Sequence, residues 1–294
     1  MTVKTVGIIG LGMIGGSMAL DLKRRGYAER IVGVEQDPVH AAAAGTIGLV
    51  DAVLPYEQCL AEADIVVVAI PVGAAVPLVT DILNHFRDGA ASGDGIPWRD
   101  KIVIDVCSTK EMICLETRYH PCRGQFVSTH PMAGTEYSGP WAAMEGMFDG
   151  RACIIANAEE SDPKALTAIE ALYDCLHMRP IRMDAAQHDI HTAYVSHISH
   201  VTSFALALTV LDKEKDEKHI FDLASGGFSS TVRLAKSSAD MWVPILTQNR
   251  DNVLQVIDTY IEKMQAFRDA IAVVDAGKIR SLIEDANHIK KIIR

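Results

Sequence analysis

A histidine near the middle of the chain is the residue best suited to acid–base chemistry. His130 lies in the segment Ser128-Thr-His-Pro-Met-Ala-Gly-Thr-Glu136. Its imidazole, with an ordinary pKa of about 6.5, can accept the proton of a substrate hydroxyl near neutral pH. The chain also begins with a glycine-rich nucleotide-binding pattern, which would bind a hydride acceptor. A proton acceptor and a hydride acceptor together are what an alcohol-oxidising dehydrogenase needs.

The glycine-rich pattern is Gly10-Leu-Gly12-Met-Ile-Gly15, which matches GxGxxG between a β-rich run and a helical one. The first glycine allows a tight turn, the second lets the backbone approach a pyrophosphate, and the third permits close helix packing. Free N–H groups at the start of the helix would hold the anion. The cofactor-binding residues predicted from this pattern are Gly10, Leu11, Gly12, Met13, Ile14 and Gly15.

An acidic residue favours one nucleotide over the other. Glu35 ends the second β-rich run, 20 residues after Gly15. A carboxylate at this point can accept hydrogen bonds from the ribose hydroxyls of adenosine. The same charge would repel a 2'-phosphate, and no lysine or arginine occurs between Arg30 and Arg87 to offset it. The sequence therefore predicts NAD rather than NADP as the cofactor.

The composition is that of a globular protein of two domains. The chain has 294 residues, of which 49% are hydrophobic and 22% are charged. A formal net charge of -10 argues against a nucleic-acid partner or an anionic membrane surface, because both polyanions would be repelled. An anionic substrate would therefore need locally placed cations. The six cysteines form no CxxC pair, and we expect reduced thiols.

The location expected for the protein is the cytoplasm. The N-terminus runs directly into a predicted strand and lacks the basic region and long apolar core of a signal peptide. The longest apolar stretch, residues 65–79, contains proline and glycine and is shorter than the roughly 20 residues that a membrane-spanning helix needs. We therefore expect no membrane span.

Short β-rich runs alternate with helical patterns through the first 184 residues. The β-rich runs are residues 5–9, 31–35, 64–70, 101–106, 125–128 and 152–156. The helical patterns are residues 13–25, 38–45, 73–87, 109–119 and 163–177. This alternation predicts an α/β fold with a Rossmann-type, doubly wound parallel sheet that binds ligands at the carboxyl ends of its strands. His130 should lie at that edge, and residues 88–97 should form a surface loop.

After residue 184 the β signal disappears, and long helical patterns cover residues 185–212 and 239–293. We therefore predict an NAD-binding domain over 1–184 and an all-helical domain over 185–294. Apolar residues recur at helical intervals in the second pattern, which fits either a core within the chain or the seam of a homodimer, and we expect the homodimer. The stripe consists of Leu246, Asn249, Val253, Val256, Tyr260, Met264, Phe267 and Ile271.

Several local segments together resemble prephenate dehydrogenase. They are Asp105-Val-Cys-Ser-Thr-Lys110, the HPMAGTE segment that begins at His130, Ser196-His-Ile-Ser-His200, and the stretch from Gly226 through Arg233 to Met241-Trp242. The resemblance covers the chain from Gly10 to the late helices. It implies oxidative decarboxylation of prephenate to 4-hydroxyphenylpyruvate in tyrosine biosynthesis, with arogenate as the substrate of close relatives. Hydride would pass to NAD+, and aromatisation would drive the loss of CO2.

The resemblance also implies roles for individual residues. His130 takes the hydroxyl proton, and the hydroxyl of Ser108 orients this histidine and the substrate. Arg233 grips a substrate carboxylate, which its planar guanidinium suits. Glu136 either forms an ion pair that gates the pocket or satisfies nearby backbone donors.

Two histidines in the SHxxH segment complete the predicted pocket. By the same resemblance, His200 hydrogen-bonds an oxygen of the substrate side chain, and His197 packs nearby. His188 is a weaker pocket candidate, and His191 faces solvent or caps the helix. Lys110 and Trp242 are expected near the ligand, although a tryptophan in such a helix is more often part of the core.

The four histidines 188, 191, 197 and 200 also raise the possibility of a metal site. At 100° per residue they fall as two pairs on roughly opposite sides of a regular helix. One helix cannot bring all four to one ion, so we expect no metal.

Two other functions fit part of the pattern. A β-hydroxyacid dehydrogenase would join the same two kinds of domain but usually relies on a catalytic lysine in the helical one. An NAD(H)-sensing protein would not need His130, Ser108, His200 and Arg233 together. The chain has no room for an added chorismate mutase or ACT domain, so we expect a single activity.

Overall fold

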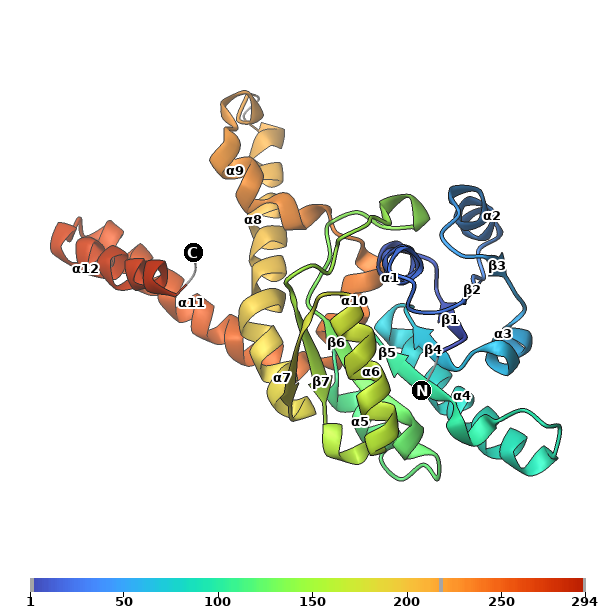
Figure 1. Cartoon of the computed structure of the whole chain (residues 1–294). Coiled ribbons are helices and arrows are strands. Elements are labelled where there is room, and N and C mark those ends of the chain that lie inside the picture. Colours follow the sequence, from blue (N-terminus) through green and yellow to red (C-terminus); the bar gives the residue numbers. More distant parts are fainter. Residues whose placement is uncertain (1–2, 217–218, 293–294) are drawn as a thin grey trace.

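The computed structural model describes residues 3–216 and 219–292. In these residues a sheet of eight strands has the order β3-β2-β1-β4-β5-β6-β7-β8, and helices cover both of its faces (Figure 1). The strands are β1 (Thr5–Ile9), β2 (Arg30–Val34), β3 (Ala52–Val53), β4 (Ile65–Val68), β5 (Ile102–Asp105), β6 (Phe126–Pro131), β7 (Ala152–Ala156) and β8 (Arg179–Met183). The predicted Rossmann-type architecture is confirmed.

Two strands depart from the predicted parallel sheet, β7 and the strand β8 that pairs in parallel with it. Strands β1 to β6 pair in parallel, but β7 runs antiparallel to β6, with His130 opposite Ile154. Parallel neighbours need a crossover connection, usually a helix. Residues 132–151 contain only the short 3-10 turn Pro140–Ala142, so the chain returns alongside β6 in the opposite direction. The sequence analysis also did not predict β3 and β8.

The helices of the sheet domain are α1 (Met13–Arg24), α2 (Pro38–Ile47), α3 (Tyr56–Glu62), α4 (Val72–Ser92), α5 (Glu111–Thr117) and α6 (Pro163–Cys175). The sheet separates two apolar cores. One contains Met18 and Leu22 of α1 with Leu172 of α6, and the other contains Val79 and Phe86 of α4.

The predicted surface loop over 88–97 is wrong in its first half. Helix α4 continues to Ser92 and ends at Gly93, which has a φ of 71°. A Cβ on Gly89 would lie 2.5 Å from the ring of Trp98, so this glycine lets the added helical turn pack on the tryptophan. Tertiary packing therefore keeps helical a segment whose glycines suggested a loop.

The helical half consists of α7 (Ala185–Thr192), a π-helical turn (Ala193–His197), α8 (Ile198–Asp216), α9 (Gly226–Thr231), α10 (Ala239–Gln248), α11 (Arg250–Ala272) and α12 (Ala276–Ala286). The two long predicted helices are therefore divided. The second breaks at Asn249 and again at Val274, whose φ of 54° lies in the left-handed region. Asp275 then caps α12 by accepting a hydrogen bond from the N–H of Lys278.

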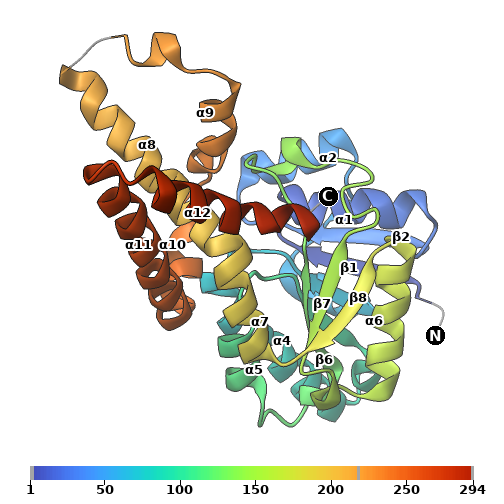
Figure 2. The same cartoon turned by 90° about the vertical axis from the view of Figure 1, so that its left-hand side faces the viewer.

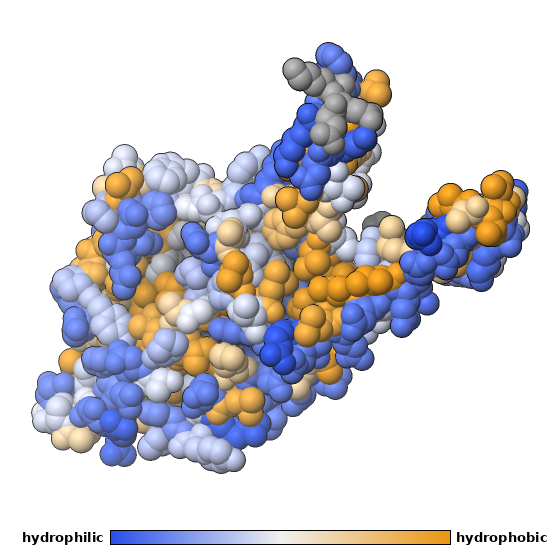
Figure 3. Space-filling view, turned by 180° about the vertical axis from the view of Figure 1, so that it is seen from behind, coloured by the Kyte–Doolittle hydropathy of each residue, from blue (hydrophilic) through white to orange (hydrophobic). Residues whose placement is uncertain are grey.

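Helix α8 and the α11–α12 hairpin project away from the sheet (Figures 1 and 2). Figure 3 shows apolar side chains gathered between these projecting helices. Large exposed apolar residues of α8 and α11 are Leu208, Leu211, Leu254, Ile261, Met264 and Ile271. The helical stretch Ala185–Lys215 is also long and apolar enough, by length and composition alone, to cross a membrane. Its buried polar residues His188, Asp189 and His197 instead make contacts inside the protein.

Candidate active site

The glycine-rich turn has the space that a bound nucleotide requires. Gly10 has a φ of 95°, and a Cβ on it would lie 2.5 Å from the carbonyl oxygen of Ala69. A Cβ on Gly15 would lie 2.0 Å from the carbonyl oxygen of Gly10. In contrast, a Cβ on Gly12 would meet nothing within 4 Å. Packing therefore requires the first and third glycines, and the surface over the second is open, as a pyrophosphate needs.

Glu35 follows β2 and faces this turn. Its carboxylate accepts hydrogen bonds from the N–H of Leu11 at 3.0 Å and from the N–H of Asp37 at 3.1 Å. The side chain of Leu11 is fully buried against Gly33, so only its backbone faces the turn. The Sδ of Met13 accepts a hydrogen bond from Thr135, in the segment that follows β6, and Ile14 is half-buried.

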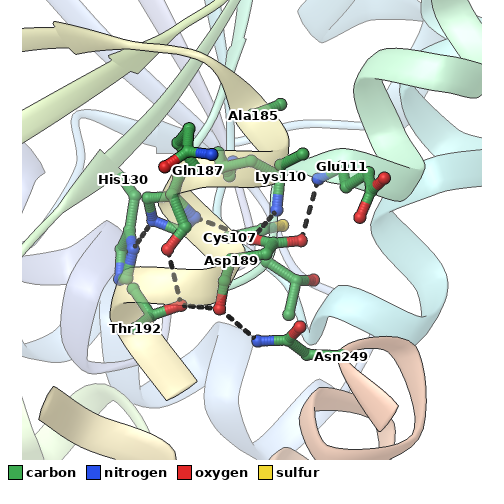
Figure 4. Close-up of polar contacts among 12 residues, drawn as sticks. Cys107, Lys110, Glu111, His130, Ala185, Gln187, Asp189, Thr192 and Asn249 are labelled. Carbon is green, nitrogen blue, oxygen red and sulfur yellow. Dashed lines mark hydrogen bonds and ion pairs between the residues drawn. The ribbon is translucent and has the colours of Figure 1, made fainter. Parts of the chain in front are cut away.

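His130 is the penultimate residue of β6, at the carboxyl edge of the sheet. Its Nδ1 lies 2.8 Å from Nε2 of His188, whose Nδ1 lies 2.7 Å from Oδ1 of Asp189 (Figure 4). Burial holds the pKa of His130 well below its ordinary value, and His188, Lys110 and His197 lower this pKa further. His130 is therefore neutral at physiological pH and can accept a proton.

Asp189, which the sequence analysis did not single out, connects the helical half to the sheet. One oxygen of its carboxylate accepts the N–H of Lys110 at 2.8 Å, and the other accepts the N–H of Glu111 at 2.9 Å. These donors belong to the start of α5, after β5. Its own carbonyl oxygen accepts a hydrogen bond from Asn249 at 2.7 Å. The adjacent acid in the His188-Asp189 pair was the only available signal in the sequence.

Lys110, which was expected near the ligand, forms an ion pair in the interior. Its side chain is completely buried, and its ammonium pairs with Asp105 and donates to the carbonyl oxygen of Thr129 at 2.7 Å. Asp105 also accepts a hydrogen bond from the hydroxyl of Ser128 at 2.9 Å. This buried pair fixes the end of β5 to the strand that carries His130.

Ser108 is half-buried and follows β5 by three residues. Its hydroxyl forms no hydrogen bond with any part of the chain that the structure describes. The partner of His130 in the structure is thus His188, and not the serine that the sequence analysis assigned to orienting it.

The π-helical turn changes which histidines lie together. A regular helix would place His188 and His197 on opposite sides. A π-turn contains one extra residue, which reduces the angle between them to about 80°. Both are buried, and Nδ2 of Asn249 lies within hydrogen-bonding distance of His197 Nδ1 and of the Asp189 carbonyl. The prediction of opposite faces is therefore wrong for this pair. His191 is exposed to solvent.

His200 and Trp242 form a stack. Their ring centroids are 3.6 Å apart at an interplanar angle of 27°, and His197 meets the edge of the same tryptophan at 5.8 Å. The Nδ1 of His200 lies 3.1 Å from the carbonyl oxygen of Ser196. Trp242 is only 6% exposed and packs in the core between α10 and α4. Its indole N–H is buried without a hydrogen-bond partner among the described residues.

The cation predicted to bind the substrate, Arg233, is paired with Glu136 in the structure. Its guanidinium donates to Glu136 at 2.6 Å and is half exposed. A hydrogen bond from the backbone N–H of Glu136 itself and the contact with Arg233 lower the pKa of this carboxyl, so the ion pair and the backbone contact are both present. Burial lowers the pKa of His200, and the charge of Arg233 lowers it further. Among residues 3–216 and 219–292, no group of three or more His, Cys, Asp or Glu side chains could hold a metal ion.

Two family models together match most of the chain. One, described as prephenate dehydrogenase, nucleotide-binding domain, matches residues 18–180, and the other, described as prephenate dehydrogenase, dimerization domain, matches residues 184–285. The chain belongs to the prephenate dehydrogenase family. It is an oxidoreductase, so the alternative of an NAD(H)-sensing protein is excluded.

Named members of the prephenate dehydrogenase family support the assignment. A prephenate dehydrogenase of Bacillus subtilis (strain 168) is 30% identical over 94% of this chain and 72% of its own. A cyclohexadienyl dehydrogenase of Zymomonas mobilis is 28% identical over 94% of this chain and 91% of its own. The fold matches prephenate dehydrogenase from A. aeolicus in complex with hydroxyphenyl propionate and NAD+, with a TM-score of 0.86, 24% identity and coverage of 100% and 99% of the two chains.

Proposed function

We propose that this protein catalyses the NAD-dependent oxidative decarboxylation of prephenate to 4-hydroxyphenylpyruvate, in the tyrosine biosynthesis of the cytoplasm. The observation that carries the proposal is a half-buried His130, with its pKa held well below the ordinary value, at the carboxyl edge of a nucleotide-binding sheet. The Nε2 of this histidine has no hydrogen-bond partner among the described residues. The nearby group of His200 and Arg233 offers polar side chains for binding an anionic ring compound.

The residues of the chain divide the work of this reaction. NAD+, when bound over the glycine-rich turn, supplies the acceptor for the hydride. Nε2 of His130 accepts the proton of the ring hydroxyl as hydride leaves the same carbon. Release of CO2 follows as the ring becomes aromatic and needs little acid catalysis. The hydroxyl of Ser108 is free to donate to the substrate.

Binding of the dianionic substrate is assigned to the helical half. Arg233 can exchange its pairing with Glu136 for a substrate carboxylate and hold it through two parallel hydrogen bonds. The indole N–H of Trp242 is a buried donor that an oxygen of the substrate would satisfy, and leaving such a donor unpaired costs about 1–3 kcal/mol.

A second substrate, arogenate, is favoured by one observation. The carbonyl oxygen of Ser196 can only accept a hydrogen bond, so Nδ1 of His200 carries the proton. The neutral ring then presents the lone pair of Nε2. That lone pair can accept from the ammonium group of arogenate but not from the keto oxygen of prephenate. A crystal structure titled Synechocystis arogenate dehydrogenase matches this chain with 25% identity and a TM-score of 0.76, covering 99% and 100% of the two chains.

We further propose that the protein is a homodimer that pairs through its C-terminal helices. The match to a dimerization domain and the exposed apolar residues of α8 and α11 support this assembly. A standard interface buries roughly 800 Å² on each partner, which helices of this length can supply.

The deciding experiment is to follow NADH formation with prephenate and, separately, with arogenate at equal concentrations. We expect turnover with prephenate and NAD+, and much less with NADP+. Preference for arogenate would support the second substrate. No turnover with either compound would contradict both, and the β-hydroxyacid dehydrogenase reaction would then be the next to test.

A further inference from the structure

We infer that His188 and Asp189 are positioning residues that hold His130 in the tautomer with its lone pair on Nε2. The inference deepens the proposed function and uses it only for the kinetic part of the test. The three side chains form one line of hydrogen bonds, from His130 through His188 to Asp189 (Figure 4). His130 comes from the sheet, and the other two come from α7.

The chemistry of the donors and acceptors fixes the direction of this line. A carboxylate can only accept, so Nδ1 of His188 must carry a proton and donate it to Asp189. A neutral imidazole has one protonated nitrogen, so Nε2 of His188 must be an acceptor. The Nδ1 of His130, at 2.8 Å from it, is then the donor. The lone pair of His130 is left on Nε2.

Burial supports the neutral state that this argument needs. His188 has almost no exposed surface, and burial lowers its pKa, whereas Asp189 acts in the opposite direction. A cationic His188 would donate from both nitrogens and would force His130 into the other tautomer. The ammonium of Lys110 also opposes a positive charge on either imidazole.

Asp189 is itself held in place by backbone groups of the other half. It accepts the N–H groups of both Lys110 and Glu111, so its carboxylate has little freedom to turn. The orientation of the base therefore depends on the contact between α7 and the start of α5. The helical half, to which substrate binding is assigned, therefore also aligns the base on the sheet.

The proton balance is simple. The substrate O–H bond breaks, and its proton bonds to Nε2 of His130, which becomes an imidazolium. Its Nδ1–H remains donated to His188, and the negative charge of Asp189 stabilises the pair. No proton needs to leave His188 for the step to occur.

The kinetic test compares two substitutions at one position. His188→Gln keeps an oxygen that can accept from Nδ1 of His130, whereas His188→Leu offers no acceptor. We expect His188→Leu to lower kcat roughly 10- to 100-fold with KM for the substrate nearly unchanged, because a positioned base contributes about 10²–10⁴ to rate. His188→Gln should recover most of the loss. Equal activity of the two variants, whether both high or both low, would contradict the inference.

A second measurement needs no turnover. Long-range proton–nitrogen NMR spectra of protein with ¹⁵N-labelled histidine distinguish the two imidazole tautomers, and His130→Gln identifies the signals of His130. We expect the Nδ1–H tautomer in the wild type and in His188→Gln, and a mixture in His188→Leu. An Nε2–H tautomer in the wild type would overturn the inference. The Nδ1–H result in a protein inactive with prephenate and arogenate would retain the inference and reject the proposed function.

Discussion

The two halves of the molecule bury their apolar residues in different ways. The sheet half has two cores, and many of their residues, among them Val6, Ile65 and Phe86, have no exposed surface. The helical half has a small separate cluster around Ala193, Val253 and Val256, and it leaves large apolar side chains exposed along α8 and α11. The comparison indicates that the first half has sufficient core of its own, whereas the second packs part of its apolar surface on the sheet half and leaves the rest for the proposed dimer to cover.

The same contrast divides the chemistry. The sheet half supplies a base fixed on a strand, over the buried pair of Lys110 and Asp105. In the proposed function the helical half supplies the groups for the substrate, and its Arg233 is 50% exposed. Substitutions in each half can test this division.

The first prediction concerns the base of the sheet half. We expect His130→Asn to lower kcat by roughly 10²–10⁴, because the amide cannot accept the hydroxyl proton. Affinity for the product of the proposed reaction should remain, since ligand binding is assigned to the helical half. Calorimetry with 4-hydroxyphenylpyruvate measures that affinity. Equal loss of binding and turnover would show that the division between the halves is wrong.

The second prediction concerns the buried pair below the base. Lys110→Met leaves the carboxylate of Asp105 buried without its ion partner, so we expect the free energy of unfolding to fall by about 3–5 kcal/mol. Urea unfolding measures this value. In the double variant with Asp105→Asn, the unpaired charge is gone, so much of the lost free energy of unfolding should be recovered. An unchanged stability of the single variant would contradict the buried pairing.

The third prediction concerns the exposed apolar stripe. Met264 on α11 is 52% exposed, and we expect Met264→Asp to shift the protein from dimer to monomer, because pairing would bury an unpaired charge at a cost of several kcal/mol. Light scattering after size-exclusion chromatography measures the mass. The matched control is Tyr119→Asp, at a site 91% exposed on the sheet half, which should stay dimeric. If both variants are monomeric, or if both remain dimeric, the proposed dimer interface on α11 is wrong.

The fourth prediction is a pH dependence that resides in the helical half. Burial lowers the pKa of His197 to about 4. Its unfolded pKa is about 6.5, so below that pH the unfolded chain binds a proton that the folded chain does not. Stability should therefore fall as pH drops from about 6.5 towards 4, by about 1–2 kcal/mol at pH 5. His197→Gln should flatten this slope, whereas substitution of the exposed His191 should leave it unchanged.

The smallest expected effect concerns the nucleotide site of the sheet half. Glu35→Ser should weaken NAD binding roughly tenfold, or about 1.4 kcal/mol, since a charged acceptor for the ribose hydroxyls is lost. Affinity for NADP should rise relative to NAD, because the repulsion of the 2'-phosphate is removed. Fluorescence titration measures both. Unchanged affinity for NAD would remove Glu35 from the site.

The features predicted well from sequence are those with local causes. The turn from Gly10 to Gly15 needs its glycines for reasons of sterics within a few residues, and the alternating strands and helices gave the Rossmann-type sheet. The stripe on α11 was predicted as a core or a dimer seam. Val256 is buried, as a core within the chain predicts, whereas Met264 is exposed and the dimer seam stays a proposal.

The features that were missed depend on residues distant in the chain. Asp189 gained its importance from the N–H groups of Lys110 and Glu111, which lie 79 and 78 positions away. The sequence led us to expect Lys110 near the ligand, but it does not show that this side chain lies buried beside Asp105. Strand β7 is antiparallel because no crossover helix connects it to β6. The intervening segment, residues 132–151, is rich in turns, and its lack of a helix was not recognised from the sequence.

The π-helical turn between α7 and α8 determines how the residues after it are oriented relative to those before it. The turn adds one residue between the residues that align the base and those proposed to contact the substrate. It therefore changes which residues before and after it share a face of the helix. Deleting one residue within Ala193–His197 would restore regular winding and leave the later residues on their present faces, whereas regular winding with all five residues kept would rotate everything beyond them by about 100°. His200 would turn away from Trp242 while His188 stayed in place. The orientation of the SHxxH histidines therefore depends on the winding of this turn as well as on the spacing within the segment.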